Sequence, residues 1–364
     1  MNIVMLLTNS FHPDVRVYKE AVYLVEQGHR VTILCWDREA ESELPQKEKK
    51  DGIRIIRFRI PSVAGTGYHQ IGAYVRFIKA CRSYLVKHPT DFVHCHDLDG
   101  MMVYKLSGIK RIPYVFDMHE FYIQGDGIKR MVLRRLVGKF IQKSHYSLYE
   151  NDGYLKIYPP KVTERLLPLK NYPGDYLKRL KKTDSDKLRI AYIGCVRSQI
   201  PQFTALFEAC KGMEDVRVDI HGGGIDLPAL KELGKKYHNV FIHGQYDGIR
   251  ESSVLYQNTD VLFCGYDADN PNYQKDAEVV KFYEAIVTGT PMIMTEGIGM
   301  AQKVRKNGFG VTADTRSAAS IKEKIQVFLQ DRKILRGFSE NMLAKASDYR
   351  WEEAVGVLQI IYRK

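Results

Sequence analysis

The sequence predicts an α/β protein built from two doubly wound parallel sheets. Short apolar runs alternate with segments of helical periodicity along most of the chain, as in repeated strand–helix–strand units. A polar, proline-containing stretch at 159–187 interrupts this alternation near the middle. The 364 residues are enough for two domains, each with a core of its own.

The first predicted domain spans 1–165. Buried parallel strands are predicted from short apolar runs, at 2–8, 30–36, 92–95 and 112–116. Helices are predicted from the spacing of apolar residues, at 14–28, 68–87 and 101–107. The segment 53–60 alternates apolar and basic residues, which is typical of an edge strand.

Two successive strands of this domain end in histidines and acidic residues. The clusters are HCHD at 94–97 and DMHE at 117–120. Because the ligand crevice of a parallel sheet lies beyond the carboxyl ends of its strands, we expect the two clusters to converge there. A metal site is disfavoured because the usual ligand spacings are absent.

A long basic helix is predicted at 128–149. Six basic residues lie between 129 and 143, and they interleave with apolar residues around the helix. Long basic side chains can cover apolar surface and bind anionic lipid. Contact with a membrane and a solvated basic helix are both open at this point.

The second predicted domain spans 188–345 and follows a linker at 166–187. Its strands are predicted from apolar runs at 188–193, 216–220, 240–244, 261–264 and 292–294. Helices are predicted between them. Apolar residues at helical spacing between 351 and 361 then predict a C-terminal helix within 346–364, which we expect to pack back on the first domain.

Glycines follow two strands of the second domain. Gly194 opens a short loop that contains Arg197, and His221 precedes three glycines at 222–224. Such joints let backbone N–H groups approach a ligand, and the amino end of the next helix favours an anion. Taken alone, these joints are also simply tight turns.

The segment 281–291, KFYEAIVTGTP, predicts a short buried helix that ends at Gly289. Apolar residues fill most of its positions, so Lys281 and Glu284, three residues apart, share one side. These two residues form a candidate ligand site. A surface ion pair is the alternative.

The composition excludes several classes of protein. With 45% hydrophobic and 27% charged residues, the chain is neither disordered nor membrane-spanning, and no signal peptide is evident, so a cytoplasmic protein is expected. The six cysteines have no metal-site spacing and are expected to be free thiols. The net charge of +12 indicates an anionic partner.

Together, these motifs resemble the family 4 retaining glycosyltransferases. The resemblance covers essentially the whole chain, at segments 13–34, 93–100, 114–120 and 191–198 and at an E-A-x-x-x-G-x-P pattern over 284–291. It implies the GT-B fold, in which two Rossmann-like domains face each other across a cleft. The last pattern is the most specific match, and in the family its glutamate binds the ribose hydroxyls of the nucleotide.

The resemblance also implies roles for individual residues. The catalytic residues would be His119, Asp276 and Glu284. The donor site would be formed by Gly194, Arg197, His221, Gly222, Gly223, Lys281 and Glu284. The acceptor or the transferred sugar would be positioned by Arg16, His96, Asp97 and Glu120.

The chain departs from the family pattern at two places. Asp276 stands where the family has a glutamate eight residues before the second one. The lysine that usually follows the phosphate-binding arginine is missing after Arg197, and Lys281 is a candidate replacement. No metal or other cofactor is expected.

The implied reaction is retaining transfer of a sugar from a nucleotide sugar, with UDP preferred over GDP. The expected acceptor is a saccharide, free or linked to polyprenyl diphosphate, in the synthesis of a cell-surface polysaccharide. The basic residues 129–143 would hold the protein at the inner face of the plasma membrane.

Two other classes stay open: a non-hydrolysing nucleotide-sugar epimerase and a catalytically silent sugar-nucleotide binding protein. Nucleic-acid binding is disfavoured because the basic residues are spread along the chain and no recognised module is present. A dehydrogenase is disfavoured because no G-x-G-x-x-G follows the first strand.

Overall fold

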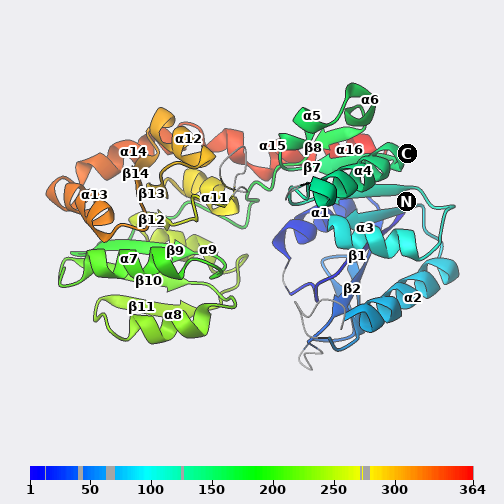
Figure 1. Ribbon diagram of the computed structural model, residues 1–364, viewed down its shortest axis with the longest axis horizontal. Coiled ribbons are helices and arrows are strands. Elements are labelled where there is room, and N and C mark those ends of the chain that lie inside the picture. Colours follow the sequence, from blue (N-terminus) through cyan, green and yellow to red (C-terminus); the bar gives the residue numbers. More distant parts are fainter. Residues whose placement is uncertain are drawn as a thin grey trace. The chain divides into compact units, whose positions relative to one another are not determined.

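The computed structural model describes residues 1–12, 14–39, 44–62, 70–123, 127–270, 273 and 279–363. The chain divides into two compact units, and Figure 1 labels their helices and strands. The first unit comprises Met1–Asn171 and Ala354–Lys364, and the second comprises Tyr172–Glu353.

The first unit contains an eight-stranded sheet within the described residues, in the order β3-β4-β2-β1-β5-β6-β7-β8. Its strands are β1 (Asn2–Leu7), β2 (Arg30–Asp37), β3 (Lys47–Lys50), β4 (Ile53–Arg59), β5 (Phe92–His96), β6 (Tyr114–Met118), β7 (Tyr146–Tyr149) and β8 (Leu166–Pro168). Neighbouring strands pair in parallel, except that β3 pairs with β4 in the antiparallel direction.

The helices of this unit cover both faces of the sheet. They are α1 (Val15–Glu26), α2 (Ile71–Lys87), α3 (Asp97–Leu106), α4 (Gly127–Lys143), α5 (Gly153–Ile157), α6 (Pro160–Thr163) and α16 (Val357–Ile361). One core cluster joins α2, α3 and α4 to Val93, Cys95 and Phe116. Because strand side chains alternate between faces, His94, His96 and Asp117 point to the opposite face, where His94 and Asp117 contact side chains of α1.

The second unit contains a six-stranded parallel sheet within the described residues, in the order β11-β10-β9-β12-β13-β14. The strands are β9 (Leu188–Ile193), β10 (Val216–His221), β11 (Val240–Gly244), β12 (Val261–Cys264), β13 (Met292–Thr295) and β14 (Gly310–Ala313). The helices are α7 (Ile200–Cys210), α8 (Leu227–Gly234), α9 (Ser252–Gln257), α11 (Val280–Thr288), α12 (Gly299–Asn307), α13 (Ala318–Gln330) and α14 (Lys333–Leu343).

The second sheet is doubly wound, as predicted. One core cluster contains Tyr192 of β9 with side chains of α7 and α13, and another contains Ile193 of the same strand with side chains of α11 and α12. Successive residues of one strand therefore pack against helices on opposite faces.

Several predicted elements differ from the structure. The predicted helix 128–149 ends at Lys143, and its last four residues form β7, because Tyr146–Tyr149 pairs with the parallel strand β6. The predicted linker 166–187 begins with β8, so the first unit extends beyond residue 165. The segment 53–60 is not the edge strand, because β3 lies outside it.

The single C-terminal helix predicted within 346–364 is replaced by shorter pieces. A 3₁₀ helix at Ala346–Tyr349 precedes α15 (Trp351–Val355), and Gly356 separates α15 from α16. Glycine weakens a helix interior, which accounts for the break. In the described part of the chain, no helix has the length and apolar character required to span a membrane.

Candidate active site

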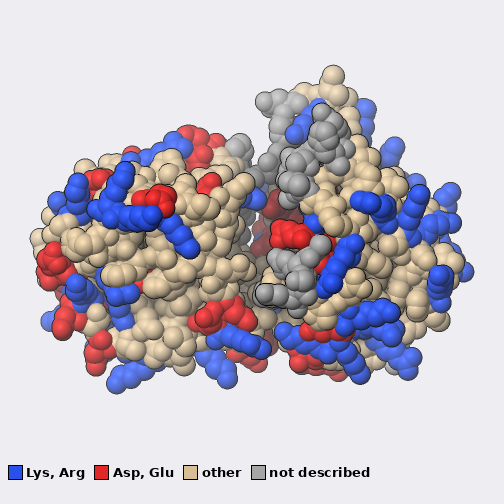
Figure 2. Space-filling model, turned by 90° about the horizontal axis from the view of Figure 1, so that it is seen from below, with Lys and Arg blue, Asp and Glu red and all other residues tan. Residues whose placement is uncertain are grey.

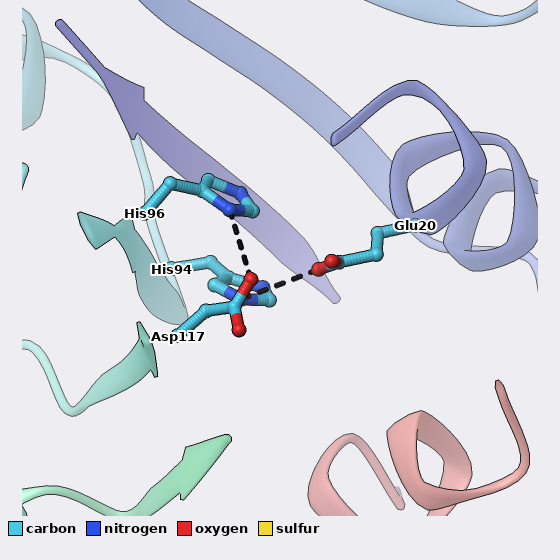
Figure 3. A group of neighbouring side chains, drawn as sticks. All are labelled: Glu20, His94, His96 and Asp117. Carbon is cyan, nitrogen blue, oxygen red and sulfur yellow. Dashed lines mark hydrogen bonds and ion pairs between the residues drawn. The ribbon is translucent and has the colours of Figure 1, made fainter. Parts of the chain in front are cut away.

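A buried polar cluster lies at the carboxyl end of the first sheet. Figure 3 shows Glu20 reaching from α1 toward His94, with His96 and Asp117 beside them. Glu20, His94 and Asp117 are fully buried, and His96 is 2% exposed. The clusters HCHD and DMHE thus converge, as the order of the strands predicted.

Arg16 holds the carboxylates of this cluster together. Its Nη2 lies 2.7 Å from Asp117 Oδ1, and its Nη1 lies 3.1 Å from Glu150 Oε2. Its Nε lies 3.3 Å from Glu20 Oε1, one helical turn further along α1. Burial alone would lower the pKa of Arg16, but these three carboxylates raise it, so the guanidinium stays charged.

His119 lies between two carboxylates. Its Nε2 is 2.7 Å from Asp117 Oδ2, and its Nδ1 is 3.2 Å from Asp97 Oδ2. Burial alone would lower the pKa of His119, but Asp97 and Asp117 raise it well above its usual value. The imidazole is therefore a cation at neutral pH, with its ring orientation fixed from both sides.

Asp97 is held in a strained backbone conformation. Its φ of 60° lies in the left-handed region, which is rare for a residue other than glycine. Tyr122 Oη donates a hydrogen bond to Asp97 Oδ1. Burial alone would raise the pKa of Asp97, but His119 lowers it to about 2. This backbone conformation and the hydrogen bond from Tyr122 hold the Asp97 carboxylate against His119.

Four of the five site residues predicted in the first unit therefore lie in this network, and the fifth does not. Arg16, His96, Asp97 and His119 belong to one network. Glu120 is exposed, and within the described residues its carboxylate makes no hydrogen bond or ion pair, although its carbonyl accepts one from Tyr154 Oη at 2.8 Å.

Sequence reasoning missed Glu20 and Glu150, both of which contact Arg16. The four-residue spacing of Arg16 and Glu20 was a signal for the first of them. No local signal marked Glu150, because its contact with Arg16 spans 134 residues.

A metal ion would find ligands in this cluster, because one donor atom from each of Glu20, His94, His96 and Asp117 lies within 4.8 Å of the others. Arg16 already supplies positive charge to Glu20 and Asp117 at distances of 3.3 and 2.7 Å. A dication would have to displace or repel this guanidinium. The donor set therefore fits an ion-pair network better than a metal centre.

In the second unit, the two glycine-containing joints pack against each other. The N–H of Gly194 donates to His221 O at 2.9 Å, and that of Val196 donates to Gly223 O at 2.8 Å. A Cβ on Gly222 would lie 1.7 Å from Gly194 O, so only glycine fits there. The N–H groups of Arg197 and Gly223 donate no hydrogen bond within the described part of the chain.

Lys281 reaches these joints from α11. Its ammonium lies 3.6 Å from the centroid of the Tyr192 ring, and a Cβ on Gly194 would lie 2.7 Å from it. The side chain is buried, and among the described residues it has no ion pair or hydrogen bond. Burial lowers the pKa of Lys281 to about 8. A buried ammonium without a counter-ion is unfavourable, so this position favours an anionic ligand.

Glu284 lies one turn further along α11 and is 8% exposed. Tyr256 Oη donates a hydrogen bond to Glu284 Oε2 at 3.0 Å. Gly289 ends the helix with a φ of 67°, as its sequence predicted. Because Lys281 and Glu284 are both buried, the alternative of a surface ion pair is wrong.

The other predicted donor residues differ in their surroundings. Arg197 is exposed, and its side chain makes no ion pair with any described residue. His221 stacks on His243 at 4.3 Å and lines a cavity of about 400 Å³ with Arg217 and Asp219. Burial, together with the neighbouring His243, lowers the pKa of His221 to about 4. Asp276 lies outside the described residues.

His221 belongs to a second group of side chains of the types that can ligate a metal. One donor atom from each of Asp219, His221 and His243 lies within 4.8 Å of the others. Asp219 accepts two hydrogen bonds from Arg217, at 2.8 and 2.9 Å. Its carboxylate is therefore already paired with a cation.

Solved structures with the same fold extend over nearly the whole chain. Sucrose-phosphate synthase from Thermosynechococcus elongatus has a TM-score of 0.78 at 15% identity and covers 100% of this chain and 98% of its own. HepE from Anabaena, in complex with UDP and glucose, has a TM-score of 0.70 at 13% identity, with coverage of 99% and 98%. These similarities define the chain as a protein of the GT-B fold.

WaaG, a glycosyltransferase involved in lipopolysaccharide biosynthesis, has a TM-score of 0.67 at 15% identity, with 100% of both chains covered. Two family models match the sequence: "Glycosyl transferase 4-like domain" over 13–148 and "Glycosyl transferases group 1" over 178–344. The chain therefore belongs to the glycosyltransferases of the family 4 type. The comparison with curated proteins finds no match.

Proposed function

We propose that this glycosyltransferase takes a sugar from a UDP-sugar and transfers it with retention of anomeric configuration. The observation that carries the proposal is the buried ammonium of Lys281, unpaired within the described residues and placed against the joint at Gly194. A nucleoside diphosphate supplies the negative charge that this position lacks. Arg197 and the amides of Arg197 and Gly223 provide further donors for the same phosphates.

Glu284 would bind the ribose hydroxyls of the donor. Its carboxylate is buried, and the hydrogen bond from Tyr256 fixes its orientation. HepE, a structural neighbour, has been solved with UDP-glucose and with UDP and glucose. We therefore place UDP before GDP as the nucleotide.

The chemical step breaks the bond between C1 of the sugar and the diphosphate oxygen. The acceptor oxygen forms a new bond to C1 on the same face, and the acceptor proton passes to the departing phosphate. Lys281 and Arg197 would stabilise the charge that develops on the diphosphate, so we propose that no metal is required. Turnover is accordingly expected to persist in EDTA.

The first unit would bind the acceptor or the transferred sugar. His119 is held as a cation by Asp97 and Asp117 and can donate hydrogen bonds to sugar hydroxyls. Asp117 is fully buried and Asp97 is held by Tyr122, so the position of His119 is set before the substrate arrives.

For the acceptor, we propose a saccharide carried on polyprenyl diphosphate in the synthesis of a cell-surface polysaccharide. Helix α4 supports this proposal. It exposes six basic residues together with Ile128, Met131 and Val132, whose exposures are 76%, 43% and 52%. Basic and apolar side chains on one exposed helix suit the inner surface of an anionic membrane.

The stereochemical proposal is tested by proton NMR on UDP-α-glucose and other UDP-α-sugars incubated with the enzyme. Slow donor hydrolysis by a retaining enzyme gives the α-sugar first, before mutarotation. First release of the β-sugar would contradict retention. Formation of an epimeric UDP-sugar in the absence of acceptor would instead indicate the epimerase.

A further inference from the structure

Tyr362 at the C-terminal end of the described chain contacts the buried cluster of the first unit. Its hydroxyl lies 3.0 Å from His94 Nδ1, and the residue is 2% exposed. Its ring packs edge-on against Phe92, with centroids 5.4 Å apart. The segment Ala354–Lys364 is part of this unit, so the contact belongs to the unit's own core.

A continuous run of polar contacts leads from Tyr362 toward His119. His94 Nε2 lies 3.5 Å from Glu20 Oε2, the pair marked in Figure 3. Glu20 Oε1 lies 3.3 Å from Arg16, and Arg16 is paired with Asp117 at 2.7 Å. Asp117 in turn lies 2.7 Å from His119. The side chains between the two ends are all at least nine-tenths buried.

We propose that Tyr362 is a positioning residue for His119: its hydroxyl fixes the tautomer of His94 and thereby the charge of Glu20 beside Arg16 and Asp117. This inference rests on the proposed function, which uses His119 to hold a sugar. It assigns a role in the first unit's site to a side chain from the far end of the sequence.

The protonation states of the cluster support this role. Burial and Asp117 raise the pKa of Glu20 well above its usual value while Arg16 opposes them, so the charge of Glu20 depends on its immediate neighbours. Burial and His96 lower the pKa of His94 well below its usual value, so His94 is neutral. In the tautomer with its proton on Nδ1, His94 donates a hydrogen bond to Tyr362 Oη. Its Nε2 then faces the Glu20 carboxyl at 3.5 Å, and among the described residues neither of these two groups has a hydrogen-bond partner there.

Removing the hydroxyl would leave His94 Nδ1–H as a buried donor without an acceptor. The other tautomer avoids this loss by moving the proton to Nε2, where it faces Glu20 and favours the ionised carboxylate. The added negative charge raises the pKa of His119 further. The charged or titratable groups around His119 that define this response are Asp117, Asp97, His96, Arg16, Glu20 and Glu150.

The test is Tyr362→Phe in the full chain, which keeps the ring and removes only the hydroxyl. We expect the melting temperature and the KM for UDP-sugar to stay close to those of the wild type. We expect kcat to fall about twofold, because His119 stays charged and only becomes a weaker hydrogen-bond donor to the sugar. In protein with isotope-labelled histidine, NMR should show the His119 titration displaced upward by about half a pH unit or more.

Gln359→Ala is the matched control. It removes an exposed hydrogen bond of 3.0 Å between the same C-terminal segment and Gln27, but it leaves the buried run of contacts intact. Its kcat and its His119 titration should equal those of the wild type.

An unchanged His119 titration in Tyr362→Phe would overturn the inference, and so would a loss of kcat that only matches a loss of folded protein. His119→Ala separates this failure from failure of the proposed function. If His119→Ala retains turnover, the proposed use of His119 is wrong, while the NMR titration of Tyr362→Phe still decides whether the hydroxyl controls the cluster.

Discussion

At the scale of a residue, two lysines of the second unit show how a lysine suited to a ligand differs from one that is paired within the fold: Lys182 is partly buried and Lys281 is buried. Burial lowers the pKa of Lys182 and of Lys281 to about 8 in each case. Lys182 Nζ donates hydrogen bonds to the carbonyls of Tyr256 (2.7 Å) and Thr259 and to Thr290 Oγ1 (2.9 Å). Lys281 has no such acceptor among the described residues. The first lysine is paired within the fold, and the second is suited to a ligand.

Lys281→Met should weaken binding of UDP without destabilising the fold, because a buried, unpaired charge is replaced by an apolar side chain of similar length. Lys182→Met should instead destabilise the fold and leave the binding of UDP unchanged. It leaves buried acceptors unsatisfied, at a cost of about 1–3 kcal/mol each in the free energy of unfolding. Calorimetric titration with UDP and thermal unfolding of both variants test the pair. Equal UDP affinity in wild type and Lys281→Met would refute the donor assignment.

The pKa of Lys281 also predicts how UDP affinity depends on pH. Because the folded-state pKa is depressed to about 8, the ammonium is charged below this pH and loses its charge as the pH rises through it. Affinity for UDP should therefore fall above pH 8, by up to about tenfold per pH unit. In Lys281→Arg the guanidinium stays charged, so this fall should disappear. A wild-type affinity that is flat from pH 7 to 9.5 would count against the assignment.

Some residues of the site could be predicted from the sequence, because their signal is local. Lys281 and Glu284 stand out by their three-residue spacing in an apolar helix, and His96 and His119 by their place after strands. Tyr362 could not be found in this way, since its contact with His94 joins positions 268 residues apart. Such a pair becomes visible only when the fold brings both ends of the chain together.

At the scale of elements, the packing of the two joints in the second unit depends on one glycine. In Gly222→Ala the new Cβ would lie 1.7 Å from a backbone oxygen, which side-chain movement cannot relieve. We expect a loss of about 1–3 kcal/mol in the free energy of unfolding, or roughly 2–12 °C in melting temperature. Gly223→Ala is the control, because its Cβ would meet Gln245 at an ordinary 3.5 Å. Equal melting temperatures of the two variants would contradict this account.

Helix α4 provides a second prediction at this scale. Replacing Lys129, Arg130 and Arg135 by Gln should reduce binding to phosphatidylserine vesicles by about 3 kcal/mol, a factor of about one hundred. The control variant replaces Lys231, Lys235 and Lys236, which are exposed in the second unit, and removes the same charge. If both variants lose binding equally, net charge rather than α4 determines membrane contact. Vesicle sedimentation distinguishes these outcomes.

Elements were predictable from the sequence where the hydrophobic pattern was long or where the segment was apolar enough to be buried on both faces. The parallel strands β1, β2, β5, β9 and β10 are of this kind. The short strands β3 and β7 were missed, because KEKK is polar and YSLY directly follows a helix. Both form because a neighbouring strand offers hydrogen bonds, which is a property of the sheet rather than of the segment.

At the scale of the whole molecule, the net charge of +12 is not concentrated in one tract on the face shown in Figure 2. Lys and Arg side chains are spread over both units there; they are mixed with Asp and Glu in the second unit and outnumber them in the first, which carries almost all of the net charge. Direct recognition of a nucleic acid usually requires a basic stripe on one face. This distribution agrees better with local anion sites, one at the glycine joints and one at α4.

The measurement that tests the central claim most directly is a thermal-shift panel of UDP, GDP and their sugars, in EDTA, with wild type, Glu284→Ala and the control Glu296→Ala. A ligand that binds only the folded state at one hundred times its Kd stabilises that state by about 2.7 kcal/mol. We predict a rise in melting temperature with UDP-sugars for wild type and Glu296→Ala, and none for Glu284→Ala. No rise with any nucleotide sugar, or an equal rise in Glu284→Ala, would contradict the account.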